Sequence, residues 1–296
     1  MTLQPRAVVV HRRTELDDLL ARHATIGQVR FFLTTRDRDP QTVEVAHAAQ
    51  QRARDTVLAA IPNEWRRAVV EREDLSRFAF APEDVVVVVG QDGLVANAAK
   101  YLDGQPVVGV NPAPDRNPGV LVPHAPTAAG PLMIAATNGR AAVQERTMVQ
   151  ARADDGQMLV ALNEIFVGHR SHQSARYRLR ADDREERQSS SGIIVGTGTG
   201  ATGWVRSCWL ERASTMALPA PEATELCWFV REAWPSPMTA TTLTEGRLAD
   251  GDVLAVDADS DQLVAFGDGI EADALSITWG MRVEVTRSRR VLRLVV

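Results

Sequence analysis

The sequence has few cysteines, a single lysine and no long apolar run. Two cysteines, Cys208 and Cys227, cannot form a disulfide framework, which predicts a reducing compartment with the cytoplasm as the default location. No apolar stretch reaches the length of a membrane-spanning helix, so we expect no membrane partner. Lys100 is the one lysine among 33 basic residues, so any phosphate site that needs a lysine must use it.

Positive charge is not in excess either. The formal net charge is −5, which excludes a broadly basic surface, and we expect no nucleic-acid partner. The composition is otherwise that of a globular protein, with 45% hydrophobic and 24% charged residues. A chain of 296 residues can form one large or two medium domains.

Strand and helix patterns alternate in the first part of the chain. Five valines in Asp84–Val89 predict a fully buried strand, followed by a helix over 94–102 and a strand over 106–110. Val29–Thr34 is also predicted as a strand, and Pro131 confines any helix around it to the residues that follow. This alternation predicts a Rossmann-like α/β layered N-terminal domain.

The second part of the chain is rich in strand patterns. Residues 157–167 and 185–196 each read as one continuous strand, and a helix is predicted over 200–212. We therefore expect a β-rich C-terminal domain of the sandwich type, with the proline-rich stretch 111–126 at the boundary. The predicted division is 1–126, 127–272 and 273–296, the last being C-terminal strands for which packing back on the N-terminal domain is one arrangement.

A glycine-rich turn, Gly90-Gln91-Asp92-Gly93, follows the valine strand and precedes a helix. Ligands of α/β sheets bind at the carboxyl ends of strands, where glycines allow close approach of a phosphate and the helix N-terminus favours anions. An aspartate there can accept a hydroxyl proton during phosphoryl transfer or help to place Mg²⁺. The alternative is a simple turn in which Asp92 caps the helix.

A second glycine-rich turn spans Gly196 to Gly203. Its Gly198-x-Gly200-x-x-Gly203 spacing fits the dinucleotide-binding pattern, but the turn follows a β-rich stretch and no βαβ crossover follows it. It is not a Walker A loop, because no lysine follows the last glycine. It can be a Thr/Gly loop whose hydroxyls and N–H groups bind a base, ribose or phosphate, or a plain turn.

A polar pair, Asn163-Glu164, interrupts the apolar strand predicted over 157–167. Burying a carboxylate is costly unless it has a partner, so the presence of Glu164 in an apolar strand has to be explained. It could recognise ribose hydroxyls or an adenine edge, or Glu164 could simply face solvent.

Taken in order, these motifs and a late Phe266-Gly267-Asp268-Gly269 resemble those of NAD kinases, and the mitochondrial type looks closest. The resemblance implies a two-domain, Mg·ATP-dependent kinase that phosphorylates NAD, forms dimers or tetramers, and uses Asp92 as its catalytic base. It implies a phosphate-donor loop of Gly90, Gln91 and Gly93, and assigns no metal ligand. The acceptor-binding residues that it implies are Gly93, Asn163, Glu164, Ser191, Thr197, Thr199, Gly200 and Trp204.

One departure from the family pattern concerns the donor loop, where Gln91 replaces the second glycine. If that position requires a positive φ, a side chain there costs ~1–2 kcal/mol. If the family has a glycine there so that the phosphate can approach closely, the Gln91 side chain would crowd the donor. Three alternatives to an NAD kinase therefore remain: a related kinase with a nucleoside, sugar or lipid acceptor, a nucleotide-binding sensor without turnover, and a Rossmann oxidoreductase.

Overall fold

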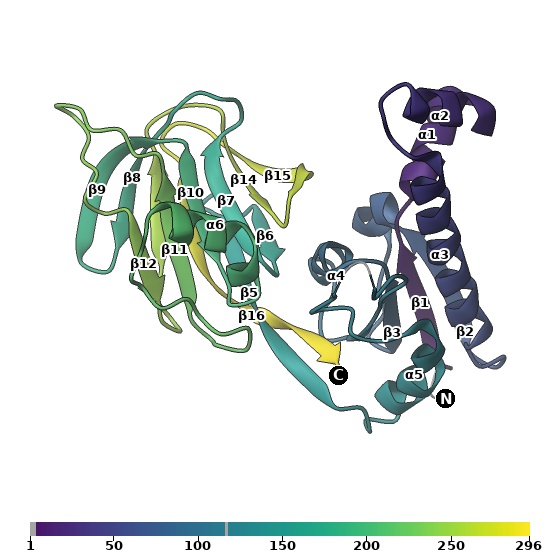
Figure 1. Cartoon of the computed structure of the whole chain (residues 1–296). Coiled ribbons are helices and arrows are strands. Elements are labelled where there is room, and N and C mark those ends of the chain that lie inside the picture. Colours follow the sequence, from purple (N-terminus) through teal and green to yellow (C-terminus); the bar gives the residue numbers. More distant parts are fainter. Residues whose placement is uncertain (1–3, 116–117) are drawn as a thin grey trace. The chain divides into compact units, whose positions relative to one another are not determined.

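The computed structural model describes residues 4–115 and 118–296 and divides the chain into two compact units (Figure 1). The first unit comprises Met1–Gln144 and Arg293–Val296, and the second comprises Glu145–Leu292. Two strands carry the chain from one unit to the other, β5 (Val143–Ala153) and β16 (Arg282–Val295).

The first unit contains a parallel sheet in the order β2-β1-β3-β4, extended by the last residues of β16. Its strands are β1 (Arg6–His11), β2 (Arg66–Glu71), β3 (Asp84–Val89) and β4 (Pro106–Val110). Every residue of β3 is buried, as expected for a central strand covered on both faces. Since the strands are parallel and β1 pairs with β3, their carboxyl ends lie side by side.

The helices of the first unit are α1 (Glu15–His23), α2 (Ile26–Thr34), α3 (Pro40–Ala59), α4 (Asp92–Ala99) and α5 (Ala129–Thr137), with short 3-10 turns η1 (Arg72–Arg77) and η2 (Pro126–Ala128). Helices α1 and α2 pack with α3 around a small core of their own, whereas α3, α4 and α5 cover the sheet on two sides. Val57 of α3 and Met133 of α5 share a core with Val9 and Val87, and Figure 1 shows α4 on the other side of β1 and β3. The α/β layered domain predicted from the sequence is confirmed.

Two local predictions in the first unit are wrong. Residues 29–34 belong to α2, because Thr25 caps the helix by accepting from the Gln28 N–H, and Val29 and Leu33 bury one helical face at i, i+4 spacing. Pro131 lies inside the first turn of α5 rather than before it, where its missing N–H has no intrahelical partner to lose.

The second unit is a sandwich of antiparallel strands around one core. One sheet has the order β12 (Glu245–Leu248), β11 (Leu226–Arg231), β10 (Gly192–Gly196), β7 (Glu164–His169), β14 (Leu263–Gly267) and β15 (Ile270–Ile277). The facing strands are β5, β6 (Met158–Ala161), β8 (Ala175–Ala181), β9 (Arg184–Ser190), β13 (Leu254–Ala258) and β16. Ile165 and Val195 from the first sheet pack in one core with Leu179 and Val256 from the second.

The other face of the six-stranded sheet is covered by a 3-10 turn, η3 (Gly200–Thr202), and α6 (Trp204–Glu211). The predicted helix over 200–212 is therefore interrupted at Gly203. The predicted strand over 157–167 is broken between β6 and β7, and the one over 185–196 is broken at Gly192, whose φ is +116°. Each of these breaks changes where a candidate site residue lies.

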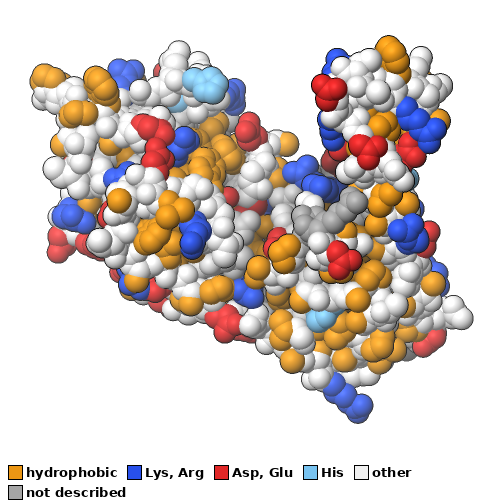
Figure 2. Space-filling view, in the orientation of Figure 1, with side chains coloured by type: hydrophobic (Ala, Val, Ile, Leu, Met, Phe, Trp, Pro, Cys, Tyr) orange, Lys and Arg blue, Asp and Glu red, His pale blue; other side chains and the backbone are white. Residues whose placement is uncertain are grey.

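Acidic and basic side chains are interspersed on the face shown in Figure 2. Within the described residues, no helix is both long and apolar enough to cross a membrane.

Candidate functional site

Asp92 begins α4 immediately after the buried strand β3 and the turn Gly90-Gln91. Its Oδ1 accepts the Leu121 N–H at 2.8 Å and its Oδ2 accepts the Val120 N–H at 3.0 Å. Both donors belong to the proline-rich stretch, and Leu121 lies 29 residues further along the chain than the carboxylate that it orients. An ionised carboxylate has about four acceptor positions, so roughly two remain for a hydroxyl or a cation.

The glycine-rich turn around Asp92 is open to its surroundings. A Cβ built on Gly93 would meet no atom within 4 Å, and one built on Gly90 would meet only the Leu94 side chain, at 3.0 Å. Gln91 has φ −105° and ψ 166°, an extended conformation that any residue adopts. The position therefore does not require a glycine for its backbone, and the strain considered from the sequence is absent.

In the second unit, Asn163 lies in the break between β6 and β7, and Glu164 is the first residue of β7. Asp268, in the turn between β14 and β15, makes this break by accepting the Leu162 N–H at 2.8 Å and the Asn163 N–H at 2.7 Å. Asp268 belongs to the late glycine motif of the sequence, where Gly267 and Gly269 flank it, but this role could not be predicted from the motif.

Glu164 has an unusual electrostatic environment. Burial, helped by the negative charge of Asp268, raises its pKa to about 8. Among the described residues, no group forms a hydrogen bond with the Glu164 carboxyl. Near neutral pH the group therefore exists largely as a carboxylic acid, which can donate as well as accept a hydrogen bond.

The Thr/Gly loop packs directly against this break. The Thr197 hydroxyl is fully buried, donates to the Leu162 carbonyl at 2.6 Å and accepts the Gly200 N–H at 3.2 Å. A Cβ on Gly200 would lie 2.1 Å from the Asn163 carbonyl oxygen, and one on Gly198 would lie 1.8 Å from the Ala220 carbonyl oxygen. Thr197 and the two glycines therefore hold backbone segments together.

Thr199 differs from Thr197. Its hydroxyl is buried and has no hydrogen-bond partner within the described part of the chain. A buried hydroxyl without a partner is costly, which makes Thr199 the member of the loop best placed to bond a ligand or a water.

Trp204 begins α6 and stacks on Phe166, with ring centroids 5.7 Å apart and an interplanar angle of 15°. Phe166 lies two residues after Glu164 and so points to the same face of β7. The guanidinium of Arg231 lies 5.4 Å from the Trp204 ring centroid. This face of the second unit combines aromatic rings with one acidic group.

Ser191 lies apart from the other acceptor candidates. The pairing of β10 with β7 places Gly196 opposite Glu164, whereas Ser191 precedes β10 at the far end of the strand. Five residues of extended chain separate Ser191 from Gly196, which is roughly 16 Å. The second unit therefore gathers Asn163, Glu164 and the Thr/Gly loop, but it does not bring Ser191 to them.

No cluster of three or more His, Cys, Asp or Glu side chains within the described residues could hold a metal ion. Mg²⁺ in phosphoryl-transfer sites is commonly held by one or two carboxylates and the substrate's phosphates. The free acceptor positions of Asp92 fit that arrangement.

No family model matches the sequence, and no curated protein matches it. The structure is similar to the crystal structure of yeast NADH kinase complexed with NADH, with a TM-score of 0.59 and 14% sequence identity. The match covers 99% of this chain and 84% of that chain. The protein thus has the NAD kinase-like fold predicted from its sequence, an α/β domain with a parallel sheet followed by an antiparallel β-rich domain.

Proposed function

We propose that the protein is a phosphotransferase that moves the γ-phosphoryl group of ATP to the 2′-hydroxyl of the adenosine ribose of NAD, giving NADP. The observation that carries this proposal is Asp92, held by two backbone N–H groups at the carboxyl edge of a parallel sheet. The fold shared with an NADH kinase and the ordered set of sequence motifs support the choice of reaction class.

In the proposed reaction Asp92 accepts the proton of the acceptor hydroxyl. The hydroxyl oxygen then forms a bond to the γ-phosphorus, the bond from that phosphorus to the β–γ bridging oxygen breaks, and ADP leaves. Bound Mg²⁺ supplies charge neutralisation on the phosphates. The open backbone at Gly93 leaves room for phosphate oxygens.

Acceptor recognition is proposed for the second unit. The Asn163 side chain and the Glu164 carboxyl would bond ribose hydroxyls, and the Thr199 hydroxyl would gain the partner that it lacks. The Trp204 ring would stack on a base. Thr197 and Gly200 would act indirectly, by fixing the backbone at Leu162 and Asn163.

The alternative of a nucleotide-binding sensor depended on Gln91 disabling the donor loop. Its unstrained backbone and exposed position remove the conformational reason for such a loss. A kinase for another hydroxyl acceptor is the alternative that substrate profiling must exclude.

The first test is NADP⁺ formation by the purified protein from NAD⁺ and Mg·ATP, with the product read through an NADP-specific dehydrogenase. Asp92→Asn is the test variant, and Asp74→Asn, an exposed aspartate of η1, is the matched control. We expect the parent and Asp74→Asn to form product and Asp92→Asn to lose it. Product formed equally by all three would reject Asp92 as the base, and no product from the parent would reject NAD as the acceptor.

A further inference from the structure

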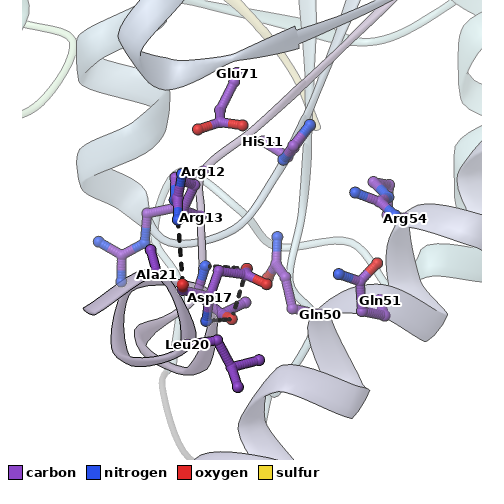
Figure 3. Close-up of a pocket in the computed structure, with 11 residues that line it drawn as sticks. His11, Arg12, Arg13, Asp17, Leu20, Ala21, Gln50, Gln51, Arg54 and Glu71 are labelled. Carbon is purple, nitrogen blue, oxygen red and sulfur yellow. Dashed lines mark hydrogen bonds between the residues drawn. The ribbon is translucent and has the colours of Figure 1, made fainter. Parts of the chain in front are cut away.

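A cavity of about 430 Å³ opens at the carboxyl end of β1 (Figure 3). It lies within the first unit, and none of the residues that line it belongs to the motifs described above. Its lining comes from four places: the end of β1 with the following turn, α1, the middle of α3 and the end of β2. The polar and charged residues among them are His11, Arg12, Arg13, Thr14, Asp17, Gln50, Gln51, Arg54 and Glu71.

Three of these residues are arginines, and their partners differ. Arg13 pairs with Asp18 at 3.0 Å. Arg12 has no carboxylate within 4.0 Å among residues 4–115 and 118–296, and its Nη2 donates instead to the Gln91 side-chain oxygen at 3.3 Å. Arg54 forms a long ion pair with Asp55, at 3.9 Å, and its charge, after burial, lowers the pKa of the His11 imidazole.

The two carboxyl groups of the cavity offset this positive charge only in part. The Asp17 carboxylate accepts the Thr14 N–H and hydroxyl, both at 2.8 Å, within the cap of α1. Burial and the neighbouring Glu73 raise the pKa of Glu71. Since three arginines line the cavity beside only two carboxyl groups, it offers guanidinium groups to an anion.

A neighbouring hollow reaches the glycine-rich turn. This second hollow, of about 300 Å³, shares Arg12, Arg13, Thr14 and Gln50 with the first and extends to Gly90 and Gln91. Gln50 also donates from Nε2 to the carbonyl of Val89, the last residue of β3, at 2.8 Å. Two arginines thus line both hollows, and the second hollow reaches the turn that directly precedes Asp92.

Lysine cannot supply this charge. The one lysine, Lys100, is buried at the C-terminal end of α4, about 12 Å from Asp92 at 1.5 Å per helical residue. Arginine suits a phosphate chain, because its planar fork bonds two oxygens at once.

We propose that this cavity binds the phosphoanhydride chain of the phosphoryl donor, with Arg12 and Arg54 as phosphate-binding residues and Gln91 as the residue that positions Arg12. The assignment rests on the proposed kinase function, since the neighbouring hollow reaches Gly90 and Gln91, directly before Asp92. Gln91, at a position where the family pattern has a glycine, would then hold the guanidinium of Arg12 in place. The ligand chemistry is shared by nucleoside triphosphates and inorganic polyphosphate.

Calorimetric binding of Mg·ATP and of Mg·tripolyphosphate, without any acceptor, tests the site. A hydrogen bond to a charged group is worth about 1.5–3 kcal/mol, so we expect Arg12→Gln and Arg54→Gln each to weaken binding about 10- to 150-fold. Arg12→Lys should recover part of that loss. Arg67→Gln, an exposed arginine of β2, is the matched control and should bind as the parent does.

Tripolyphosphate binding that falls in parallel with ATP binding supports recognition of the phosphate chain alone. ATP binding that falls while tripolyphosphate is not bound by the parent supports the site and assigns a nucleoside triphosphate as the donor. ATP affinity that is unchanged in both Arg12→Gln and Arg54→Gln overturns the proposal. Circular dichroism and melting curves identify any variant that fails to fold, in which case Arg12→Lys and Arg54→Lys replace it.

Turnover separates this inference from the proposed function. Should the parent form NADP⁺, Arg12→Gln must raise the KM for ATP more than it lowers kcat. Gln91→Ala must raise that KM less than Arg12→Gln does, and the double variant must be less than additive if Gln91 acts through Arg12. Should the parent bind ATP in an Arg12-dependent way but form no NADP⁺, the donor site stands and only the acceptor assignment fails.

Discussion

The two glycine-rich turns look alike in sequence but have opposite surroundings. A Cβ added to Gly93 in the first turn meets nothing within 4 Å, whereas a Cβ added to Gly198 or Gly200 in the second meets a carbonyl oxygen at 1.8 or 2.1 Å. Gly93 of the first turn leaves space for an atom outside the chain. Gly198 and Gly200 of the second turn let two backbone segments touch, which is the other use of a residue without Cβ.

The first turn should therefore govern activity with little effect on stability. Asp92→Asn removes the proton acceptor, and we expect NADP⁺ formation to fall by roughly 10²- to 10⁴-fold. An asparagine keeps one acceptor atom for Leu121 or Val120, so the free energy of unfolding should fall by only about 1 kcal/mol. Steady-state kinetics and urea unfolding measure the two effects, and a stability loss as severe as the activity loss would contradict the assigned role.

The second turn should show the reverse. Gly200→Ala forces a Cβ against the Asn163 carbonyl, and we expect the free energy of unfolding to fall by roughly 1–3 kcal/mol, or the chain to fail to fold. Urea unfolding followed by circular dichroism measures the loss. Gly27→Ala is the matched control, because its Cβ meets nothing and it lies in α2, where alanine favours the helix. Equal stability of the two variants would mean that the second turn is as open as the first.

Glu164, at the break between β6 and β7 that the second turn supports, should make the free energy of unfolding depend on pH. The pKa of Glu164 is raised to about 8 in the folded state from an ordinary value near 4.5, so the folded state binds its proton more tightly. This contribution is complete below pH 4.5 and is lost as the pH rises to about 8, with a slope of at most about 1.4 kcal/mol per pH unit.

Glu164→Gln should remove that slope, because glutamine is neutral throughout. Unfolding free energies at pH 5, 6.5 and 8 provide the measurement, and Glu271→Gln, an exposed glutamate of β15, should keep the parent's slope. A parent slope that persists in Glu164→Gln would assign it to another group.

The contrast between the two turns also shows what a sequence can predict. The valine run of β3 predicts a buried strand because a continuous run of apolar β-branched residues is typical of a parallel strand covered on both faces. The strand prediction for residues 29–34 was wrong because apolar and aromatic side chains suit a strand as well as a helix, and the Thr25 cap decides between the two.

Features that depend on contacts between residues far apart in the sequence could not be predicted from local patterns. The break at Asn163 is made by Asp268, 105 residues away along the chain, and no local pattern encodes that contact. The far placement of Ser191 follows from the antiparallel register of β10 on β7. Arg12 did leave a signal, since two arginines directly follow the buried strand β1 at its carboxyl end, where ligands bind in α/β sheets.

The smallest expected effect is on stability at the first turn. Gly93→Ala adds a methyl group that meets no atom of the chain, in the first turn of α4, so the free energy of unfolding should stay the same or rise by up to about 1 kcal/mol. If the space beside Gly93 is kept for the phosphates or the acceptor, the same methyl group must lower NADP⁺ formation although the fold is no weaker. Thermal unfolding and kinetics on one preparation measure both quantities. Unchanged activity would mean that this glycine, unlike those of the second turn, serves neither packing nor a ligand.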